Sequence, residues 1–541
     1  MELSAAAARR RQHAADRGLP LLTRDAILAA GRRLLSDNGA FGKLEPMLSY
    51  LLGTLQDAQP SSRTKTVKQL AAVVRADSDT LKLQNVTRAV QMALQDSSIA
   101  VREATLDLLG QFIVLRPEYA DHYYETIVKR LNDQGISVRK RVIKILRDLL
   151  VKQPTGRRAV DTCCRLVSRI SDDEEVHKLV VKTFQELWFA PPSPEGSGAD
   201  LSRDDAAARC DQLIGVIAAA GVTAQRNGWL QQLLDRLLEA PDGKRPAKEH
   251  AAVLRVCERL VKQLMDTLLA IEEQRDAADE LPEAQRHSAK TKLDEPMSHT
   301  LHALSLFCSA HPALLLPHVS TLPHFLTHDN VKGAMQHVCT MILPLLELMD
   351  RPASELLQTL ETRLAATLFR APEDLIVIAI PALCATVKRS ANFKLVIDTL
   401  VRFFDFLCRW KKMEPAAQAA QAPAAKRAML VVGMLCRYFD YDAPSVVVEW
   451  TNVDTQSSVL TTGGTINRQV FALLGGFIDS KAAPAGAALY AFKGLGQMCV
   501  RLPELVARCR PLIERSLQPS ADLKLKKQAL ANLLVLLDDD G

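Results

Sequence analysis

Hydrophobic residues recur every three or four positions along most of this chain, which is the spacing of amphipathic helices. The pattern also repeats over a longer distance. Two segments place an Asp six residues before an Arg and lead into an amphipathic run, Asp96 to Arg102 and, 37 residues later, Asp133 to Arg139. A less regular third copy runs from Asp172 to Lys178. Helix pairs that repeat at this period are typical of HEAT and armadillo arrays, so the sequence predicts an all-α, HEAT/armadillo-like helical-repeat solenoid of curved shape.

Breaks in the hydrophobic pattern divide the chain into segments, and no segment alternates like a strand. The predicted segments are, in order, a flexible N-terminus (1–20), regular HEAT repeats with a basic face (21–190), a loop (191–201), a divergent helical block (202–297), HEAT repeats (298–410), an Ala-rich linker (411–427) and C-terminal helical repeats (428–537) with an irregular loop (451–465). The charged end of the divergent block, 274–297, is expected to be an exposed connection or a partly disordered insert.

Composition agrees with a helical array. A chain of 541 residues is too long for one compact core, and a solenoid resolves this because each repeat packs only on its neighbours. The 11 Cys form no C-x-x-C pair, which favours reduced, buried thiols of an intracellular protein. The longest apolar run, 375–387, has 13 residues and contains Pro381, whereas a bilayer needs about 20. We therefore expect a buried repeat helix there.

The repeated Asp and Arg positions predict a structural feature. An Asp and an Arg that recur together in stacked repeats commonly form a ladder of ion pairs between them. The expected ladder residues are Asp96, Arg102, Asp133 and Arg139. This interpretation leaves DNA contact as the minor role for the two arginines.

Basic residues gather at 129–147, where seven cations and one acid, Asp133, give a local net charge of +6, equal to that of the whole chain. They are Lys129, Arg130, Arg139, Lys140, Arg141, Lys144 and Arg147. At about 100° per residue, Lys140, Lys144 and Arg147 fall opposite a face of hydrophobic residues. Cations with no acid between them do not stabilise a helix, but a phosphate backbone binds them. We interpret this face as a DNA-binding surface; the alternative is a solvated helix face.

Catalytic and metal-binding patterns are not evident. His324 and His328 have the spacing of two zinc ligands on a helix, but a metalloprotease needs Glu directly after the first His, and Phe325 stands there. No third ligand is obvious. Gly475-Gly476 and Gly494-Leu-Gly496 match no nucleotide-binding loop and are better explained by close helix packing. We expect no enzyme activity, no metal and no cofactor.

Several segments are more specific than a generic HEAT repeat, and together they resemble the Nipped-B-like cohesin loader family (adherin, the sister chromatid cohesion loading subunit). The resemblance covers roughly residues 20–510 and is weak from 200 to 300. The segments that carry it are 96–110, 116–124, 135–148, 182–189, Asn392-Phe393-Lys394 and 435–442.

The resemblance implies a hook-shaped solenoid in the nucleus, on chromosomes. Members of this family load cohesin onto DNA, stimulate the ATPase of the cohesin heads and hydrolyse nothing themselves. It implies double-stranded DNA and the cohesin complex, through its ATPase heads and kleisin, as partners, with Arg139 to Arg147 lying where the family presents basic residues to DNA. The family's small helical-repeat partner binds a long N-terminal region, and this chain begins almost at the solenoid. We therefore do not expect that partner here; either its binding region is encoded elsewhere or the sequence is a fragment or reduced form.

Two other classes of HEAT protein are alternatives. A transport receptor of the karyopherin kind needs an acidic inner surface for basic cargo signals, and the basic segment 129–147 argues against it. A condensin subunit or a phosphatase scaffold shares the repeat but lacks segments like 182–189 and 435–442.

Overall fold

The computed structural model describes residues 44–541 apart from several short gaps. The gaps are 116–119, 156–157, 191–200, 221–223, 240–246, 328–330, 332, 453–459, 461–464, 480–485, 519–521 and 539–541. The predicted flexible N-terminus, most of the loops expected at 191–201 and 451–465, and His328 lie outside the described residues. Within them every regular element is an α-helix or a short 3₁₀ helix, and none is a strand. The chain forms two compact units, Met1–Thr183 and Phe184–Gly541.

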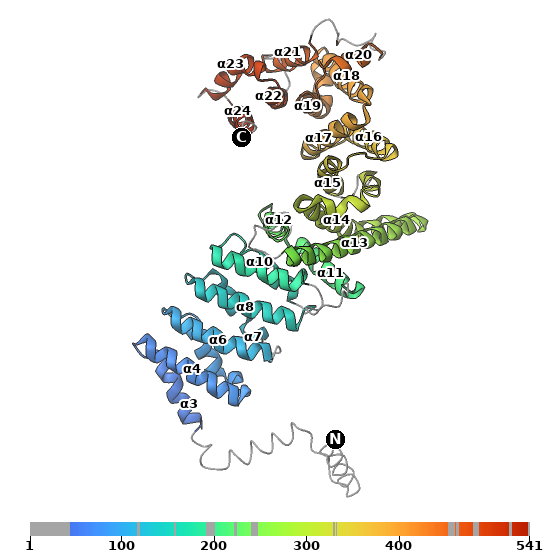
Figure 1. Cartoon of the computed structure of the whole chain (residues 1–541). Helices are drawn as coiled ribbons and strands as arrows, with labels where there is room; N and C mark the ends of the chain where they lie inside the picture. The colour runs from blue at the N-terminus through green and yellow to red at the C-terminus, as the bar shows by residue number, and fades with distance from the viewer. Residues whose placement is uncertain are drawn as a thin grey trace. The chain divides into compact units, whose positions relative to one another are not determined.

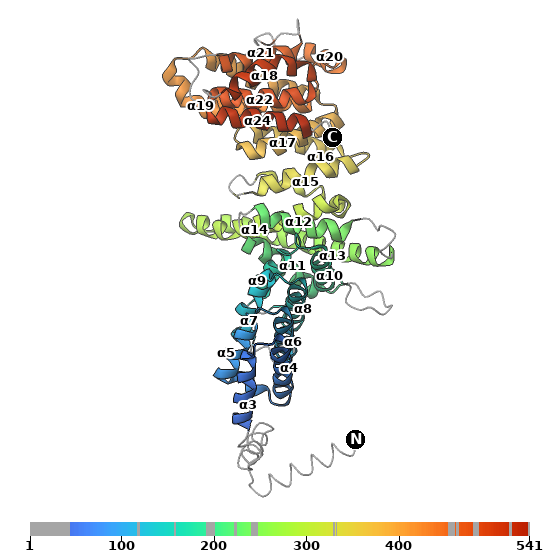
Figure 2. The ribbon, with the colours of Figure 1, turned by 90° about the vertical axis from the view of Figure 1, so that its left-hand side faces the viewer.

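The first unit is a two-layered stack of helix pairs. One layer contains α4, α6 and α8, which lie side by side in chain order (Figure 1), and the other contains α5, α7 and α9 (Figure 2). Each helix pair corresponds to one copy of the sequence repeat. The helices are α3 (Leu44–Gly53), α4 (Pro60–Ala76), α5 (Gln84–Ala93), α6 (Ile99–Leu115), α7 (Ala120–Lys129), α8 (Ile136–Lys152), α9 (Ala159–Val167) and α10 (Glu174–Trp188), which crosses into the second unit.

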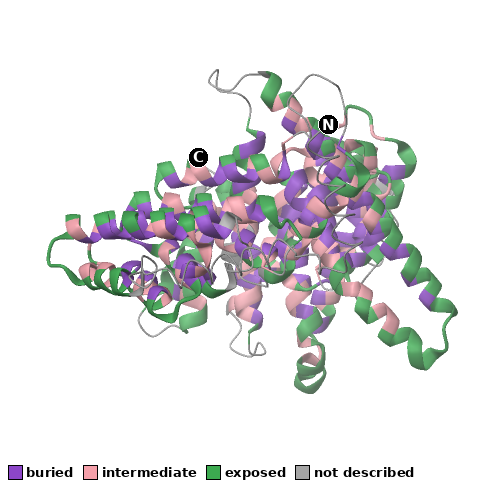
Figure 3. Cartoon of the chain, turned by 90° about the horizontal axis from the view of Figure 1, so that it is seen from below, coloured by how far each residue is buried: buried purple, intermediate pink, exposed green. Residues whose placement is uncertain are grey.

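Helix α8 shows why the repeats stack. Val138, Val142 and Ile145, on the predicted apolar face, are buried, and Leu149 is half-buried. Buried positions form stripes along the helices while other sides stay exposed (Figure 3). Removing such side chains from water stabilises each repeat against its neighbours by about 25 cal/mol per Å² of apolar surface.

The second unit continues the all-helical arrangement. Its helices are α11 (Arg203–Ala220), α12 (Ala224–Leu238), α13 (Ala247–Ala277), α14 (Glu283–Ala310), α15 (Ala334–Leu348), α16 (Ser354–Leu368), α17 (Glu373–Ser390), α18 (Phe393–Lys411), α19 (Pro415–Tyr438), α20 (Pro444–Asn452), α21 (Ile466–Asp479), α22 (Ala487–Arg501), α23 (Val506–Leu517) and α24 (Leu523–Asp538). The apolar run 375–387 lies in α17 and is mostly buried. None of the described helices combines the length and apolar character needed to cross a bilayer.

Two expected connections are helical. The charged segment 274–297 contains the end of α13, a turn and the start of α14, which pair as long helices. Arg275 of α13 binds Asp294 of α14, and Lys290 Nζ of α14 lies 2.6 Å from Oδ1 of Asp279, which belongs to the 3₁₀ turn between the two helices. The Arg275–Asp294 pair therefore joins the two helices in a segment that lacks an apolar period.

The Ala-rich segment 411–427 is likewise not a linker, because most of it forms the first half of α19. Alanine has the highest helix propensity, and Pro415 occupies the first helical turn, where its missing N–H costs nothing. Gln418 ties this half to α18, since its backbone carbonyl accepts a 3.0 Å hydrogen bond from Trp410 Nε1.

Helices α19 and α22 cross at very short distance. A Cβ on Gly433 would lie 2.4 Å from Gly494 Cα, and a Cβ on Gly494 would lie 2.5 Å from the Met429 carbonyl oxygen. Gly494 is thus needed for helix packing, and so is Gly496, where a Cβ would meet the Asn532 side chain at 2.3 Å.

Candidate nucleic-acid interface

A ladder of Arg–Asp ion pairs runs along the first unit and positions its helices. Arg63 of α4 binds Asp96 through Nε–Oδ2 at 2.7 Å and Nη2–Oδ1 at 2.8 Å. The next repeat forms the same bidentate pair, with Arg102 Nε–Asp133 Oδ2 at 2.8 Å and Nη2–Oδ1 at 2.6 Å. Arg139 Nη2 then lies 3.0 Å from Asp172 Oδ1 and also binds Asp173. Each arginine therefore pairs with the Asp of the following repeat.

The same arginines also hold the turns of their own repeats. Arg102 Nη1 donates to the Asp96 carbonyl oxygen at 2.7 Å, and Arg139 Nη1 donates to the Asp133 carbonyl oxygen at 2.7 Å. Asp133 Oδ1 accepts a hydrogen bond from the Gly135 N–H at 2.9 Å. One guanidinium thus connects a backbone turn to the carboxylate of the next turn, which fixes the spacing of successive repeats.

Electrostatics keeps these carboxylates charged. Burial raises the pKa of Asp133, but the hydrogen bonds from Arg102 and from the Gly135 N–H, together with the charges of Arg102 and Arg130, outweigh it and leave the pKa below its usual value. The pKa of Asp96 is lowered in the same way by Arg63 and the Ser98 N–H. Each charged carboxylate lies beside a guanidinium of opposite charge, and this attraction offsets the free-energy cost of burying both groups.

The Arg63–Asp96 ion pair was not predicted from the sequence, although the same Asp-to-Arg spacing is present there. Asp57 lies six residues before Arg63, the spacing of the two clear copies, and Pro60 between them obscures the similarity. At the other end of the ladder, Lys178 replaces the Arg, and its Nζ lies 2.5 Å from Glu174 Oε1 on its own exposed helix face.

The structure corrects the expectation that the three cations of one α8 face, Lys140, Lys144 and Arg147, have no acidic partner, because two of them form ion pairs. Lys140 Nζ lies 2.8 Å from Glu175 Oε2, Arg147 Nη2 lies 2.8 Å from Asp148 Oδ1, and Arg130 Nη1 lies 3.4 Å from Asp133 Oδ2. Arg141 binds Asp107 and also lies 3.7 Å from Glu103. Most of these acids belong to neighbouring repeats, so a count along the segment overestimates the local charge. Lys129 and Lys144 are exposed and form no ion pair with the described residues.

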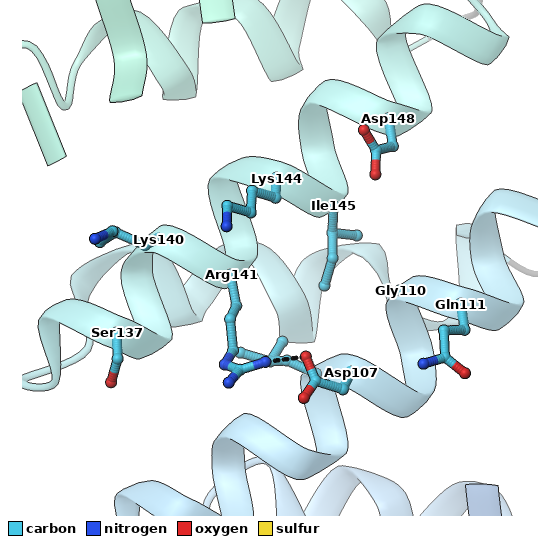
Figure 4. A pocket seen from close by; sticks show the side chains of 10 residues that line it. Asp107, Gly110, Gln111, Ser137, Lys140, Arg141, Lys144, Ile145 and Asp148 are labelled. Carbon is cyan, nitrogen blue, oxygen red and sulfur yellow. Dashed lines mark hydrogen bonds and ion pairs between the residues drawn. The ribbon is translucent and has the colours of Figure 1, made fainter. Parts of the chain in front are cut away.

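Three of the seven basic residues line one groove between α6 and α8 (Figure 4). Lys140, Arg141 and Lys144 line it from α8, Asp107 and Gln111 line it from α6, and Asp107 points toward Arg141. The groove has a volume of about 440 Å³. Its lining also includes Gly110, where an added Cβ would lie 2.8 Å from Ile145 Cγ1, so the glycine lets α6 and α8 approach. Arg139 does not line this groove, because the ladder buries it.

Among the described residues, the remaining candidate groups are not arranged as a metal site. His324 Nε2 lies 3.4 Å from Glu272 Oε1, and no cluster of His, Cys, Asp or Glu among the described residues is arranged to hold a metal. His302 and His337 stack with ring centroids 4.5 Å apart, and burial lowers their pKa values to about 4 and about 3. Both imidazoles are therefore neutral at physiological pH and serve packing.

Stacked helix pairs joined by a polar ladder define a HEAT-repeat protein, and comparisons agree. The family model described as "HEAT repeat associated with sister chromatid cohesion" matches residues 68–109 and 124–146. The Nipped-B-like protein of Homo sapiens is 31% identical over 405 residues, which are 73% of this chain and 14% of that protein. The sister chromatid cohesion protein mis4 of Schizosaccharomyces pombe is 30% identical over 162 residues, 30% of this chain and 10% of that protein.

A solved structure shares the fold. The C-terminal fragment of the Chaetomium thermophilum cohesin loader SCC2 superposes with a TM-score of 0.70 at 18% identity, covering 92% of this chain and 35% of that one. The chain is therefore a homologue of the Nipped-B-like proteins and a HEAT-repeat solenoid. It spans 14% of the length of its human relative.

Proposed function

We propose that this chain is a non-enzymatic cohesin loader, which binds DNA and the cohesin complex, promotes loading onto chromosomes in the nucleus and stimulates the cohesin ATPase. The observation that carries the proposal is the homology to Nipped-B-like proteins over 73% of the chain. A related protein of fission yeast is named for sister chromatid cohesion, and a solved protein of the same fold is named a cohesin loader.

DNA contact is proposed for the exposed side of α8. The Lys140–Glu175 pair has side-chain exposures of 36% and 69%, and pairs this exposed contribute only about 0–1 kcal/mol to stability. A phosphate can therefore replace the carboxylate at little cost. Lys144 can bind a phosphate without giving up an ion pair, because it has no acidic partner among the described residues. Arg102 and Arg139 are assigned to the ladder and not to DNA.

The ladder supports this role by keeping the repeats in register. We infer that the ATPase heads and the kleisin contact a surface of this stack. Bidentate pairs between buried side chains restrict sliding of α4, α6 and α8 past one another. The proposed contribution of the chain to loading is thus a rigid surface that holds DNA beside cohesin.

Cohesin ATPase measurements test the proposal. The rate of cohesin ATP hydrolysis is measured with duplex DNA, with and without the full chain, and the chain alone serves as the control for intrinsic activity. We expect stimulation that requires both chain and DNA. Capture from nuclear extract distinguishes the other HEAT classes: cohesin subunits support the proposal, whereas nuclear-pore proteins or phosphatase subunits contradict it.

A further inference from the structure

Two cysteine side chains meet where α22 leads into α23. Cys499 lies in the last turn of α22 and Cys509 in the first turn of α23, and the helices are joined by Leu502 and the short 3₁₀ helix η8 (Pro503–Leu505). The Cys499 Sγ lies 3.3 Å from the Cys509 Sγ, and both residues are buried. This corner of the second unit therefore holds two thiols in direct contact, and the proposed function uses neither of them.

The contact is close to the geometry of a disulfide. The S–S bond is about 2.0 Å long, so the two sulfurs lie about 1.3 Å beyond bonding distance. Closeness in the sequence alone does not produce such a contact. Cys163 and Cys164 are neighbours in α9, but successive side chains of a helix point about 100° apart, so a bond between them would distort the helix. The α22–α23 corner instead brings together side chains from two helices.

The hydrogen bond between the thiols makes them unequal. Cys499 donates its S–H to the Cys509 sulfur, and this bond lowers the pKa of Cys509, although burial opposes it, and raises the pKa of Cys499. At Cys308 and Cys339 burial raises the pKa to about 12. Because the thiolate is the nucleophile in thiol oxidation, Cys509 is the sulfur of the pair that reacts first.

We propose that Cys499 and Cys509 are a site of reversible oxidation, which hydrogen peroxide converts into an intramolecular disulfide. The Cys509 thiolate attacks one oxygen of the peroxide, the O–O bond breaks, and the departing hydroxide takes up the thiol proton and leaves as water. The Cys499 sulfur then attacks the sulfenic acid on Cys509. The S–O bond breaks, the S–S bond forms, and the hydroxyl group leaves with the Cys499 proton as a second water. The peroxide gains the two electrons that the thiols lose.

The disulfide would join α23 covalently to a helix that is already fixed in the unit. Arg501, two residues after Cys499, donates from Nε to the Cys436 carbonyl oxygen of α19 at 2.7 Å, and its Nη1 lies 2.9 Å from Asp440 Oδ1. A cross-link between two parts of the chain reduces the conformational freedom of the unfolded state. Oxidation should therefore stabilise the α22–α23 corner, and a dithiol reductant should reverse the effect by thiol–disulfide exchange.

Peptide mapping of the full chain tests the proposal. The protein is treated with a small molar excess of hydrogen peroxide, its free thiols are alkylated, and it is digested with trypsin without reduction. We expect peptide 494–501 linked to peptide 509–515, lighter than their sum by two hydrogens, and separated again by dithiothreitol; Arg510 is not cleaved because Pro511 follows it. Oxidation of other thiols while Cys499 and Cys509 stay reduced overturns the proposal.

Single variants test the order of the two steps. In Cys499→Ala the sulfenic acid on Cys509 has no partner and should be trapped by dimedone, whereas Cys509→Ala should give no dimedone adduct on Cys499. The matched control is Cys384→Ala, which also removes a buried thiol and should still form the linked peptides. An adduct on Cys499 instead of Cys509 contradicts the assignment of the nucleophile. The mapping of the unaltered protein decides the proposal even where a variant does not fold.

Chemical denaturation measures the effect of the cross-link. Peroxide should raise the urea midpoint of the unaltered protein and of Cys384→Ala by about 0.5 M, and dithiothreitol should restore the original value. The midpoint of Cys499→Ala should not rise. A disulfide that forms without raising the midpoint, or a rise that persists in Cys499→Ala, contradicts the proposed stabilisation. None of these measurements involves DNA or cohesin, so this site and the proposed function can fail separately.

Discussion

Arg102 and Asp133 form a bidentate ion pair between consecutive repeats, with side chains only 9% and 2% exposed. Because the partners are buried, the pair differs from the surface pairs on the same stack, such as Lys178–Glu174 at 71% and 79% exposed. Breaking a buried pair leaves one charge without its counter-ion in a poorly solvated place. The Arg102–Asp133 pair therefore contributes more to the stability of the stack than the surface ion pairs do.

Asp133→Ala should destabilise the protein strongly. Arg102 would keep its bonds to backbone carbonyls but lose its counter-ion, which costs about 3 kcal/mol or more. The check is the midpoint of chemical denaturation, followed by circular dichroism. Glu174→Ala, which removes an exposed pair, is the control and should shift the free energy of unfolding by about 0.5 kcal/mol or less. Equal shifts for the two variants would mean that the ladder does not stabilise the stack.

Acid should weaken the ion pairs that Asp96 and Asp133 form in the ladder. The folded pKa values of Asp96 and Asp133 lie below their usual value, which is near 3.9, about the value in the unfolded chain. The stabilisation is therefore complete above about pH 5, starts to decrease as the pH approaches the unfolded pKa and is lost as the pH falls through the folded values. Denaturation of the wild type and of Asp133→Asn at a series of pH values from 6 to 3 checks this. The difference between the two proteins should shrink as the pH falls, and a constant difference would contradict the assignment.

Gly→Ala should act in opposite directions at two glycines, one at the close crossing of α19 and α22 and the other on α21. Gly494→Ala should destabilise the second unit by about 1–3 kcal/mol or more, because the added methyl group lies 2.5 Å from a backbone carbonyl oxygen that cannot move freely. Gly475→Ala on α21 is the control, since nothing lies within 4 Å of its Cβ. Alanine should raise stability there by up to about 1 kcal/mol through helix propensity. Thermal unfolding of both variants measures the two effects, and a neutral Gly494→Ala would show that the helices can separate.

The spacing of residues in the sequence predicted the helical fold and pointed to Asp96, Arg102, Asp133 and Arg139. A repeat can be recognised in the sequence itself, because recognising it requires no knowledge of tertiary contacts. Ion pairs between residues of different repeats could not be predicted from the sequence in the same way. Lys140 meets Glu175 and Arg141 meets Asp107, residues 35 and 34 positions away, so the net charge of 129–147 said little about the surface. The helices at 274–297 and 411–427 were missed for related reasons. In the first, charges pair across two helices, and in the second, alanine replaces the larger apolar residues that mark a period.

Neutralising the exposed side of α8 tests the DNA contact. The change is Lys140, Lys144 and Arg147 to Gln together, because Glu at position 140 would face Glu175 and confuse repulsion within the protein with loss of DNA contact. We expect weaker binding to duplexes of any sequence, since phosphate contacts do not read bases. The slope of log affinity against log salt should flatten by about 0.9 for each lost contact, about 2 to 3 in total. Fluorescence anisotropy with one defined and one random duplex at several salt concentrations measures both quantities.

The control for this experiment removes the same charge elsewhere on the first unit. Lys65, Lys68 and Lys82 are exposed on α4 and the turn after it, and their change to Gln should leave most of the affinity and slope intact. Helicity and melting of both triple variants should match the parent, because each replaces only exposed or half-buried side chains. If the α8 variant folds and keeps its affinity and slope, this face is solvated and DNA binds elsewhere. If both variants lose affinity equally, binding follows the overall charge of the unit and α8 has no special role.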